Sequence, residues 1–271
     1  MTIHKRVCLH QVAFMDTPTA DFVAWCNEAG IPHMTLVTPM LFLPGDAEGA
    51  VEAMKDGKAH CAIVNHPIAM GSSLEAAGPE ESEALSRAIE VAAQVGAKAI
   101  YLVSGGRGSL LWEDAAQKFA QIVAPCLAAS EEKGVQLLVE TASNFNADMH
   151  IAHTLDDTIR LAEIAGIGVC IELQACWFEG NLRDKFRRAM PNTGLVQVSD
   201  YVYGDRTTPG RAVIGDGVVP LEALLSDILD LGYKGVFDME LIGPRIMDEG
   251  PKIAAVRSAE ALSEILDRLG A

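Results

Sequence analysis

The chain alternates between short apolar runs rich in β-branched residues and longer segments with the 3.6-residue period of helices. The runs expected to be strands are Val7–Gln11, Met34–Thr38, Ala59–Asn65, Ala99–Ser104, Val135–Glu140, Gly168–Leu173, Leu195–Ser199 and Val236–Glu240. The expected helices are Thr19–Ala29, Ala47–Lys55, Glu80–Val95, Glu113–Lys133, Leu155–Ala165, Leu182–Ala189, Leu221–Leu231 and Ile253–Leu269. This strict alternation predicts a (β/α)₈ TIM barrel that spans residues 1–271 as a single domain.

A doubly wound sheet shows the same alternation and is the rival fold. Its dinucleotide-binding form needs a G-x-G-x-x-G turn after the first strand, and the segment 11–19 contains no glycine. The turn Gly105–Gly108 follows the fourth strand, but no acidic residue ends a strand about 20 residues further on. The barrel is therefore the preferred interpretation.

The charge balance limits the partners. With 21 Lys and Arg against 37 Asp and Glu, the formal net charge is −16. Nucleic-acid binding relies on clustered cations, and no long basic run occurs, so a small-molecule substrate is expected rather than nucleic acid.

Two further features indicate a cytoplasmic protein away from the membrane. The apolar stretch after Arg6 is broken by His10, Gln11 and Asp16, so neither a signal peptide nor a membrane span is expected. The six cysteines form no C-x-x-C pair and lie in apolar segments, which is typical of reduced, buried thiols.

In a barrel, catalytic side chains lie at the carboxyl ends of the strands. The polar residues at these positions are His10, Gln11, Thr38, Asn65, His66, Ser104, Glu140, Glu172, Gln174, Gln197, Asp200 and Glu240. Four of them are carboxylates, which we expect to converge on one mouth. A carboxylate that closes a buried strand is costly unless it is paired, for example with a loop arginine, protonated or bound to a cation. The candidate arginines are Arg107, Arg206, Arg211 and Arg245.

The set Glu140, Glu172, Gln197 and Glu240 lies on the fifth to eighth strands, which are neighbours around a barrel. It offers oxygen ligands without thiolate or imidazole, so it favours Mg²⁺ or Mn²⁺ over Zn²⁺. Three carboxylates exceed the charge of such an ion, so one glutamate could act as a base. No lysine ends a strand, which disfavours Schiff-base chemistry, and no G-x-S-x-G elbow occurs.

Three motifs carry a resemblance to a known family. They are the run 134–140 ending in Glu140, the segment 196–200 followed by Gly-Asp-Gly at 215–217, and Gly-Tyr-Lys-Gly at 232–235 leading to Glu240. In these motifs the sequence resembles the sugar phosphate isomerase/epimerase family of xylose isomerase-like TIM barrels, best over about residues 98–250.

The resemblance implies a divalent ion held by Glu, Asp, His and Glu on strands five to eight. Glu140 and Glu240 match that set, whereas Glu172 stands in the place of the Asp and Gln197 in the place of the His. The family's usual histidine three residues after the Asp is Ala175 here. By resemblance, Glu140 and Glu240 would be the catalytic acid/base pair acting through an enediolate, and dimers are common.

Four further residues are candidates for substrate contact. His10 and His66 follow the first and third strands, and Arg245 lies just beyond Glu240. Trp177, with Phe178 and the loop 143–145, is expected to form an apolar wall suited to a substrate larger than a bare sugar.

Three functions stay open at this point. The first is a metal-dependent isomerase or epimerase acting on a sugar-like or hydroxy-keto compound. The second is a lyase that uses the same enolisation to cleave a C–C or C–O bond. The third is a non-catalytic barrel that has lost its metal, which Gln197 and Ala175 favour.

Overall fold

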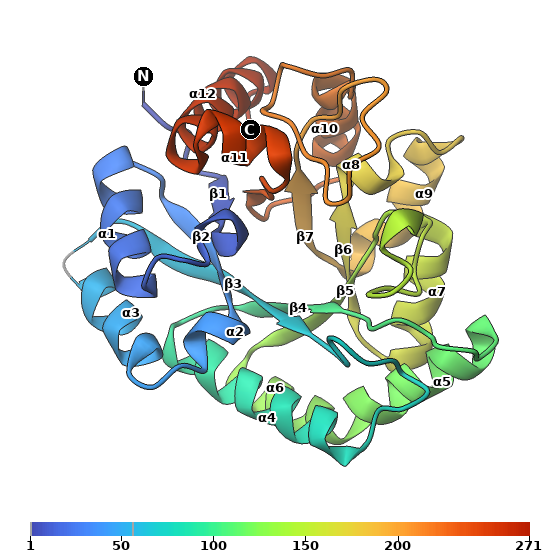
Figure 1. Cartoon of the computed structure of the whole chain (residues 1–271). Coiled ribbons are helices and arrows are strands. Elements are labelled where there is room, and N and C mark those ends of the chain that lie inside the picture. Colours follow the sequence, from blue (N-terminus) through green and yellow to red (C-terminus); the bar gives the residue numbers. More distant parts are fainter. Residues whose placement is uncertain (1, 56) are drawn as a thin grey trace.

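Eight parallel strands close into a barrel in the order in which they occur in the sequence (Figure 1). The computed structural model describes residues 2–55 and 57–271. The strands are β1 (Val7–His10), β2 (His33–Val37), β3 (His60–Pro67), β4 (Ala99–Val103), β5 (Gln136–Glu140), β6 (Gly168–Glu172), β7 (Thr193–Val198) and β8 (Phe237–Met239). β1 pairs with β8, which closes the ring, so the chain forms the predicted TIM barrel.

The helices form an outer ring around the strands (Figure 1). They are α1 (Thr19–Ala29), α2 (Thr38–Leu41), α3 (Asp46–Lys55), α4 (Pro79–Gln94), α5 (Trp112–Val123), α6 (Leu127–Lys133), α7 (Leu155–Ala165), α8 (Leu173–Cys176), α9 (Leu182–Ala189), α10 (Leu221–Asp230), α11 (Pro244–Glu249) and α12 (Pro251–Leu269). The predicted helices are confirmed, and α1, α7 and α9 have the expected bounds.

One predicted helix is divided in two. The segment 113–133 forms α5 and α6, with a 3₁₀ turn at Ala124–Cys126 between them. Pro125 lies in this turn, and proline has no backbone N–H and clashes with the carbonyl four residues earlier, which breaks the helical pattern. The short helices α2, α8 and α11 begin directly at strand ends or in the loops that follow them, and the sequence did not predict them.

Apolar side chains pack in two places. A large cluster lies between the strands and the helices, and it contains aromatic residues such as Phe22, Phe119 and Phe186. A smaller cluster includes Ile63, Tyr101, Val103, Leu138 and Leu195, on neighbouring strands of the barrel. All six cysteines are buried and free, as expected.

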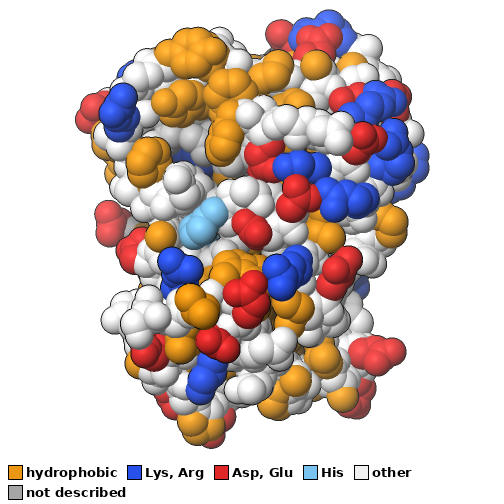
Figure 2. All heavy atoms as spheres, turned by 90° about the vertical axis from the view of Figure 1, so that its right-hand side faces the viewer, with side chains coloured by type: hydrophobic (Ala, Val, Ile, Leu, Met, Phe, Trp, Pro, Cys, Tyr) orange, Lys and Arg blue, Asp and Glu red, His pale blue; other side chains and the backbone are white. Residues whose placement is uncertain are grey.

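Charged side chains of both signs are interspersed on the face shown in Figure 2. The most basic helix, α9, pairs its cations with acidic neighbours: Arg183 with Asp227, Lys185 with Glu179, Arg187 with Asp184, and Arg188 with Asp156. Of the helices that the structure describes, none combines the length and the apolar composition of a membrane span.

The Gly-Asp-Gly motif is explained by Asp200, which lies two residues after the end of β7. Asp200 is 2% exposed, and its carboxylate accepts hydrogen bonds from the backbone N–H groups of Gly215, Gly217 and Val219, each at 3.0 Å. It also accepts from the N–H of Tyr201 at 2.8 Å. Asp200 therefore fixes the turn after the β7 loop, and it does not line the mouth, contrary to the expectation that all four strand-end carboxylates converge there.

We predict that Asp200→Ala destabilises the fold. Four backbone N–H groups would lose a charged acceptor, and a hydrogen bond to a charged group contributes about 1.5–3 kcal/mol. Because the turn can rearrange and water can replace part of this, we expect the free energy of unfolding in urea to fall by about 3 kcal/mol or more. Asp216→Ala is the matched control in the same turn. The side chain of Asp216 is 44% exposed and pairs only with the partly exposed Arg257, so its loss should cost less than about 1 kcal/mol. Equal effects would contradict this role of Asp200.

Candidate active site

A cavity of about 350 Å³ opens at the carboxyl end of the barrel. Its polar lining comprises His10, Asn65, Tyr101, Glu140, Asn146, His150, Arg211 and Glu240. Its apolar lining includes Val12, Met15, Val37, Met70, Val103, Met149 and Ile242. The cavity thus combines converging polar groups with a broad apolar wall, which is typical of small-molecule sites.

The structure divides the four predicted metal ligands into two pairs. Glu140 and Glu240 both line the cavity. Glu172 and Gln197 are completely buried and do not line it. The two residues predicted as the acid/base pair are therefore brought together in one cavity, and the two predicted supporting ligands lie behind its surface.

Arg211 provides the positive charge among the strand-end carboxylates. Its Nη2 donates to Glu240 Oε2 at 2.8 Å, and its Nη1 lies 3.1 Å from Glu172 Oε2. Nη1 also donates to the side-chain oxygen of Gln174. The guanidinium is largely buried, so these interactions are only weakly screened by solvent. Of the four loop arginines that the sequence offered as partners, Arg211 is the one in contact with Glu172 and Glu240.

The backbone around Arg211 holds the guanidinium in place. The N–H of Arg211 donates to the carbonyl of Ile242 at 3.1 Å, in the loop after β8. The next residue, Ala212, forms an antiparallel bridge with Asp200. Gln174 donates from Nε2 to the carbonyl of Gly210 at 3.2 Å, which ties α8 to the same loop. The loop after β7 is thus anchored on both sides of the arginine.

The environments of Glu140 and Glu240 shift their pKa values in opposite directions. Burial opposes ionisation of Glu240, but the charge of Arg211 and its hydrogen bond outweigh burial and hold the pKa below its ordinary value. Burial raises the pKa of Glu140 well above its ordinary value, and the nearby Glu240 and Glu172 raise it further. These shifts favour the ionised form of Glu240 and the protonated form of Glu140, which is the direction required of a base and an acid in one site.

The remaining carboxyl group of the cluster is intermediate. Burial raises the pKa of Glu172 to about 7, although Arg211 opposes this effect. Its Oε1 accepts from the N–H of Gln174 at 3.0 Å, which caps the first turn of α8. Glu172 therefore helps to fix both α8 and the guanidinium.

Two histidines, His10 and His150, belong to the polar lining of the cavity. His10 Nε2 is 2.7 Å from the hydroxyl of Tyr101, so the predicted candidate His10 is in the cavity with a partner from β4. His150 Nε2 is 3.8 Å from Glu140 Oε2. Burial lowers the pKa of His150 to about 3, so the imidazole beside Glu140 is neutral at neutral pH.

A polar layer lies inside the barrel below the mouth. The amide of Gln197 accepts from the thiol of Cys170 at 3.2 Å and donates to Asp238 Oδ2 at 3.4 Å. Asp238 is completely buried, and burial raises the pKa of its carboxyl group. Gln197 is thus engaged with its neighbours in this layer instead of facing the cavity.

The predicted ligands do not fit a divalent ion in this arrangement. Within residues 2–55 and 57–271, no three His, Cys, Asp or Glu side chains are grouped so as to hold a metal. The Gln197 amide is turned to Cys170 and Asp238, and Arg211 is in contact with both Glu172 and Glu240. A second cation at the same carboxylates would meet the repulsion of the guanidinium.

The other predicted substrate contacts are distributed differently. His66 lies outside the cavity, where its Nδ1 is 2.9 Å from the hydroxyl of Thr38. This follows from the alternation of side chains along β3, which sends Asn65 and Pro67 inward and His66 outward. Arg245 is half exposed and pairs with Asp205 at 2.7 Å, so it too lies away from the cavity. Trp177 lines a neighbouring cavity with Phe145 and Phe178, which is the expected aromatic wall.

Sequence reasoning missed Tyr101, His150 and Asp238 as members of the site or of the layer below it. Tyr101 is an inward position two residues before the end of β4, so the period of two along that strand is the signal that could have found it. His150 lies in a loop, and only the path of that loop brings it to Glu140.

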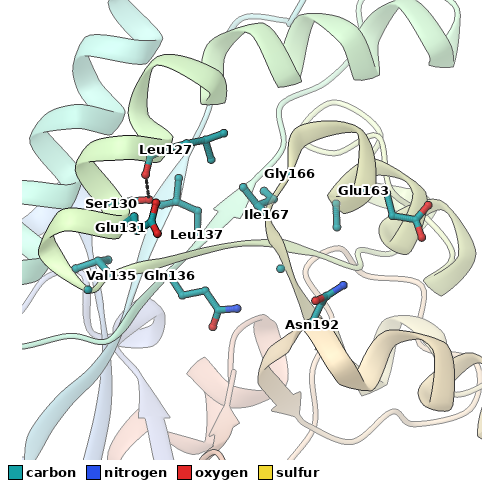
Figure 3. A pocket seen from close by; sticks show the side chains of 13 residues that line it. Leu127, Ser130, Glu131, Val135, Gln136, Leu137, Glu163, Gly166, Ile167 and Asn192 are labelled. Carbon is teal, nitrogen blue, oxygen red and sulfur yellow. Dashed lines mark hydrogen bonds between the residues drawn. The ribbon is translucent and has the colours of Figure 1, made fainter.

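A larger hollow lies at the opposite end of the barrel. It has a volume of about 760 Å³ and surrounds the amino ends of β5 and β6. Figure 3 shows Glu131 and Glu163 on opposite sides of it, with the hydroxyl of Ser130 bonded to the carbonyl of Leu127. Because barrel enzymes use the carboxyl end of the strands, this hollow is not the candidate active site.

The structure is a (β/α)₈ barrel in which buried carboxyl groups surround the Arg211 guanidinium at the carboxyl ends of the strands. The sequence model of the xylose isomerase-like TIM barrel matches residues 10–265. The chain therefore belongs to the xylose isomerase-like TIM barrel family. No curated protein sequence matches it significantly.

Solved structures show the same fold at low sequence identity. The IolI protein, described with a bound zinc atom, is 14% identical with a TM-score of 0.81, over 97% of this chain and 99% of that one. The 3-keto-D-glucoside 4-epimerase of E. coli is 15% identical with a TM-score of 0.76, over 97% and 99%. The probable 3-DHS dehydratase AsbF of Bacillus anthracis is 15% identical with a TM-score of 0.75, over 95% and 98%.

We predict that Arg211→Met weakens the fold and creates affinity for Mn²⁺. Removal of one partner from a buried ion pair leaves charges uncompensated and costs about 3–5 kcal/mol, so the urea midpoint should fall at neutral pH. The freed carboxylates should then bind Mn²⁺, which would raise the melting temperature of the variant in a saturable way. The wild-type protein should show neither effect of Mn²⁺ nor a stoichiometric metal by elemental analysis.

Arg245→Met is the control for Arg211→Met, because Arg245 pairs with Asp205 while half exposed, and its loss should cost less than about 1 kcal/mol. A stoichiometric divalent ion in the purified wild-type protein, released by EDTA with loss of stability, would contradict the interpretation of Arg211 as the resident cation.

We predict that His66 makes the fold sensitive to acid. Burial lowers the pKa of His66 to about 4, below its ordinary value of 6.5. As the pH falls through 6.5, the unfolded chain therefore binds a proton that the folded chain does not bind. Stability is therefore complete above about pH 6.5 and is lost as the pH falls toward 4, by roughly 1 kcal/mol between pH 7.5 and 5.5. Urea unfolding of His66→Gln should show that much less acid sensitivity. Substitution of the exposed His60 by Gln should leave the sensitivity unchanged.

Proposed function

We propose that this protein is an isomerase or epimerase that moves a proton at the carbon next to the carbonyl of a small sugar-like or hydroxy-keto compound. The observation that carries the proposal is that two buried carboxyl groups with different partners line one cavity: Glu240 is paired with Arg211, and Glu140 lies beside His150. Epimerase activity of a structural neighbour, the 3-keto-D-glucoside 4-epimerase, supports the class of reaction.

The proton transfers follow from the electrostatics. Glu240, ionised beside the guanidinium, would accept the proton from the carbon. Glu140, in its protonated form, would donate its proton to the carbonyl oxygen, which gives an enediol. For the isomer, Glu240 would return its proton to the neighbouring carbon while Glu140 takes the proton of the other enediol oxygen, so that both glutamates regain their starting states. For the epimer, the proton of Glu140 would go instead to the opposite face of the same carbon in an enediolate held by Arg211, and the two glutamates would regain their starting states by proton exchange with water.

Arg211 would stabilise the charge that develops on the oxygen. It lines the same cavity as the two glutamates, and its Nε is a buried donor without a protein partner among the described residues. A fixed guanidinium in a water-poor cavity stabilises an oxyanion without reorganisation at the moment of reaction. The hydroxyl of Tyr101 and the His10 ring bonded to it are further groups able to orient substrate oxygens.

A lyase is the second candidate, because the same enolisation expels a leaving group when one is present at the next carbon. The probable dehydratase among the structural neighbours favours it. The two candidates differ in product: an epimerase returns a compound of unchanged composition, whereas a lyase yields an unsaturated product and a second fragment.

The test is exchange of the carbon-bound proton in D₂O, followed by NMR over a panel of ketoses and 3-keto-sugars. The wild-type protein should exchange the proton next to the ketone of at least one compound. Glu140→Gln and Glu240→Gln should each slow that exchange by about 10²–10⁴-fold, the usual contribution of an acid or base. Glu113→Gln, on the outer surface of α5 and 64% exposed, should leave it unchanged.

Absence of exchange and of cleavage with every compound tested would contradict the proposal and favour the barrel that only binds. Exchange that persists in both glutamine variants would also contradict it, because the proton would then move through other groups. Formation of an unsaturated product would transfer the proposal to the lyase.

A further inference from the structure

A second cavity adjoins the candidate active site. It has a volume of about 330 Å³, which is at the lower end of the range of ligand pockets. Asn146, Pro209 and Arg211 line both cavities, so the two meet at the guanidinium. The boundary is formed by two loops that touch each other, since the hydroxyl of Thr208 donates to the side-chain oxygen of Asn146 at 2.6 Å.

The lining of the second cavity is aromatic. Phe145, Trp177, Phe178 and Tyr201 contribute to it from three different loops. The rings of Trp177 and Tyr201 have centroids 6.2 Å apart at 38°, and those of Trp177 and Phe178 are 6.4 Å apart at 85°. Rings at such spacings pack against one another and form a continuous aromatic surface, on which a further ring could stack or pack edge to face.

Two of these aromatic side chains are largely exposed to water, which is unfavourable for apolar groups. Phe145 is 61% and Phe178 64% exposed, and they flank the same cavity. Large aromatic side chains that gather around one exposed pocket are typical of a ligand site, because burial against a ligand would recover the hydrophobic free energy.

The charges of the second cavity are already satisfied. Asp205 pairs with Arg245, and its carboxylate also accepts from the N–H of Thr207. The hydroxyl of Tyr201 donates to the carbonyl of Asp205 at 2.9 Å. The described lining of the cavity is therefore largely aromatic with its carboxylate paired, and Arg211 and Asn146 lie at its junction with the first cavity.

We propose that the substrate has two parts: a sugar-like or keto part in the carboxylate cavity and a flat aromatic ring in the Trp177 cavity, joined by an oxygen near Arg211, as in an aryl glycoside. This inference rests on the proposed function for the first part only. The aromatic part follows from the second cavity and its continuity with the first.

Three probes separate the two parts. Phenyl β-D-glucopyranoside carries both, methyl β-D-glucopyranoside carries the sugar alone, and phenol carries the ring alone. Calorimetric titration at millimolar concentrations should show that the phenyl glycoside binds the wild-type protein at least about tenfold more tightly than the methyl glycoside. Trp177→Ala should remove this preference, and Trp177→Phe, which keeps a ring, should retain most of it.

A second variant guards against misfolding of Trp177→Ala. Phe145→Ala changes a side chain that is already 61% exposed, so the fold should be unaffected, yet the preference for the phenyl glycoside should fall severalfold. Trp25→Phe, on α1 and stacked on Phe14 away from both cavities, is the control and should behave as the wild type.

The outcomes distinguish this inference from the proposed function. Equal affinity for the phenyl and methyl glycosides overturns the aromatic site, whatever the first cavity does. A preference that survives in both Trp177→Ala and Phe145→Ala also overturns it. Binding of phenol that depends on Trp177, together with no binding of the methyl glycoside and no proton exchange with any ketose, supports the aromatic site while the proposed function fails.

Discussion

The structure depends on how the buried carboxyl groups at the strand ends are neutralised. A closed parallel barrel gathers the carboxyl ends of its strands around one axis, so Glu140, Glu172 and Glu240 come together whatever their role. Their mutual repulsion in a dry site is large unless a cation is present or a proton is retained. Here both effects operate: Arg211 compensates Glu172 and Glu240, and burial with the neighbouring carboxylates raises the pKa of Glu140, which favours its protonated form. The same division places two carboxyl groups with oppositely shifted pKa values in a single cavity.

The barrel itself could be predicted because its signal is repeated along the whole chain. Every strand found in the structure overlaps an expected one, since a buried parallel strand reads as a short apolar run. The short helices α2, α8 and α11 were not predicted, because four to six residues carry too little periodicity to be read. The break at Ala124–Cys126 had a visible cause in Pro125, but the apolar period continues across it and indicated one helix.

The site was predictable only where a strand determines the position of the side chain. Glu140 and Glu240 end the runs of β5 and β8, and the pleat directs both to the cavity. Gln197 also ends a strand, but its amide finds partners in Cys170 and Asp238, and no sequence pattern reveals that choice. Arg211 was one of four candidate loop arginines, and the path of the loop selects among them. That path is set by tertiary contacts, namely the bridge of Ala212 to Asp200 and the bond from Arg211 to Ile242.

These contacts connect the stability of the fold to its chemistry. Asp200 holds the amides of the Gly-Asp-Gly turn, the turn ends the loop after β7, and that loop places Arg211 between the two cavities. A guanidinium fixed in this way has two consequences at once. It lowers the pKa of Glu240 in the first cavity, and it leaves a buried Nε donor without a protein partner among the described residues. Because Arg211 lines both cavities, a change in the loop that moves its side chain would alter the pKa of Glu240 and the shape of the second cavity together, whereas changes at Trp177 or Phe145 would act on the second cavity alone.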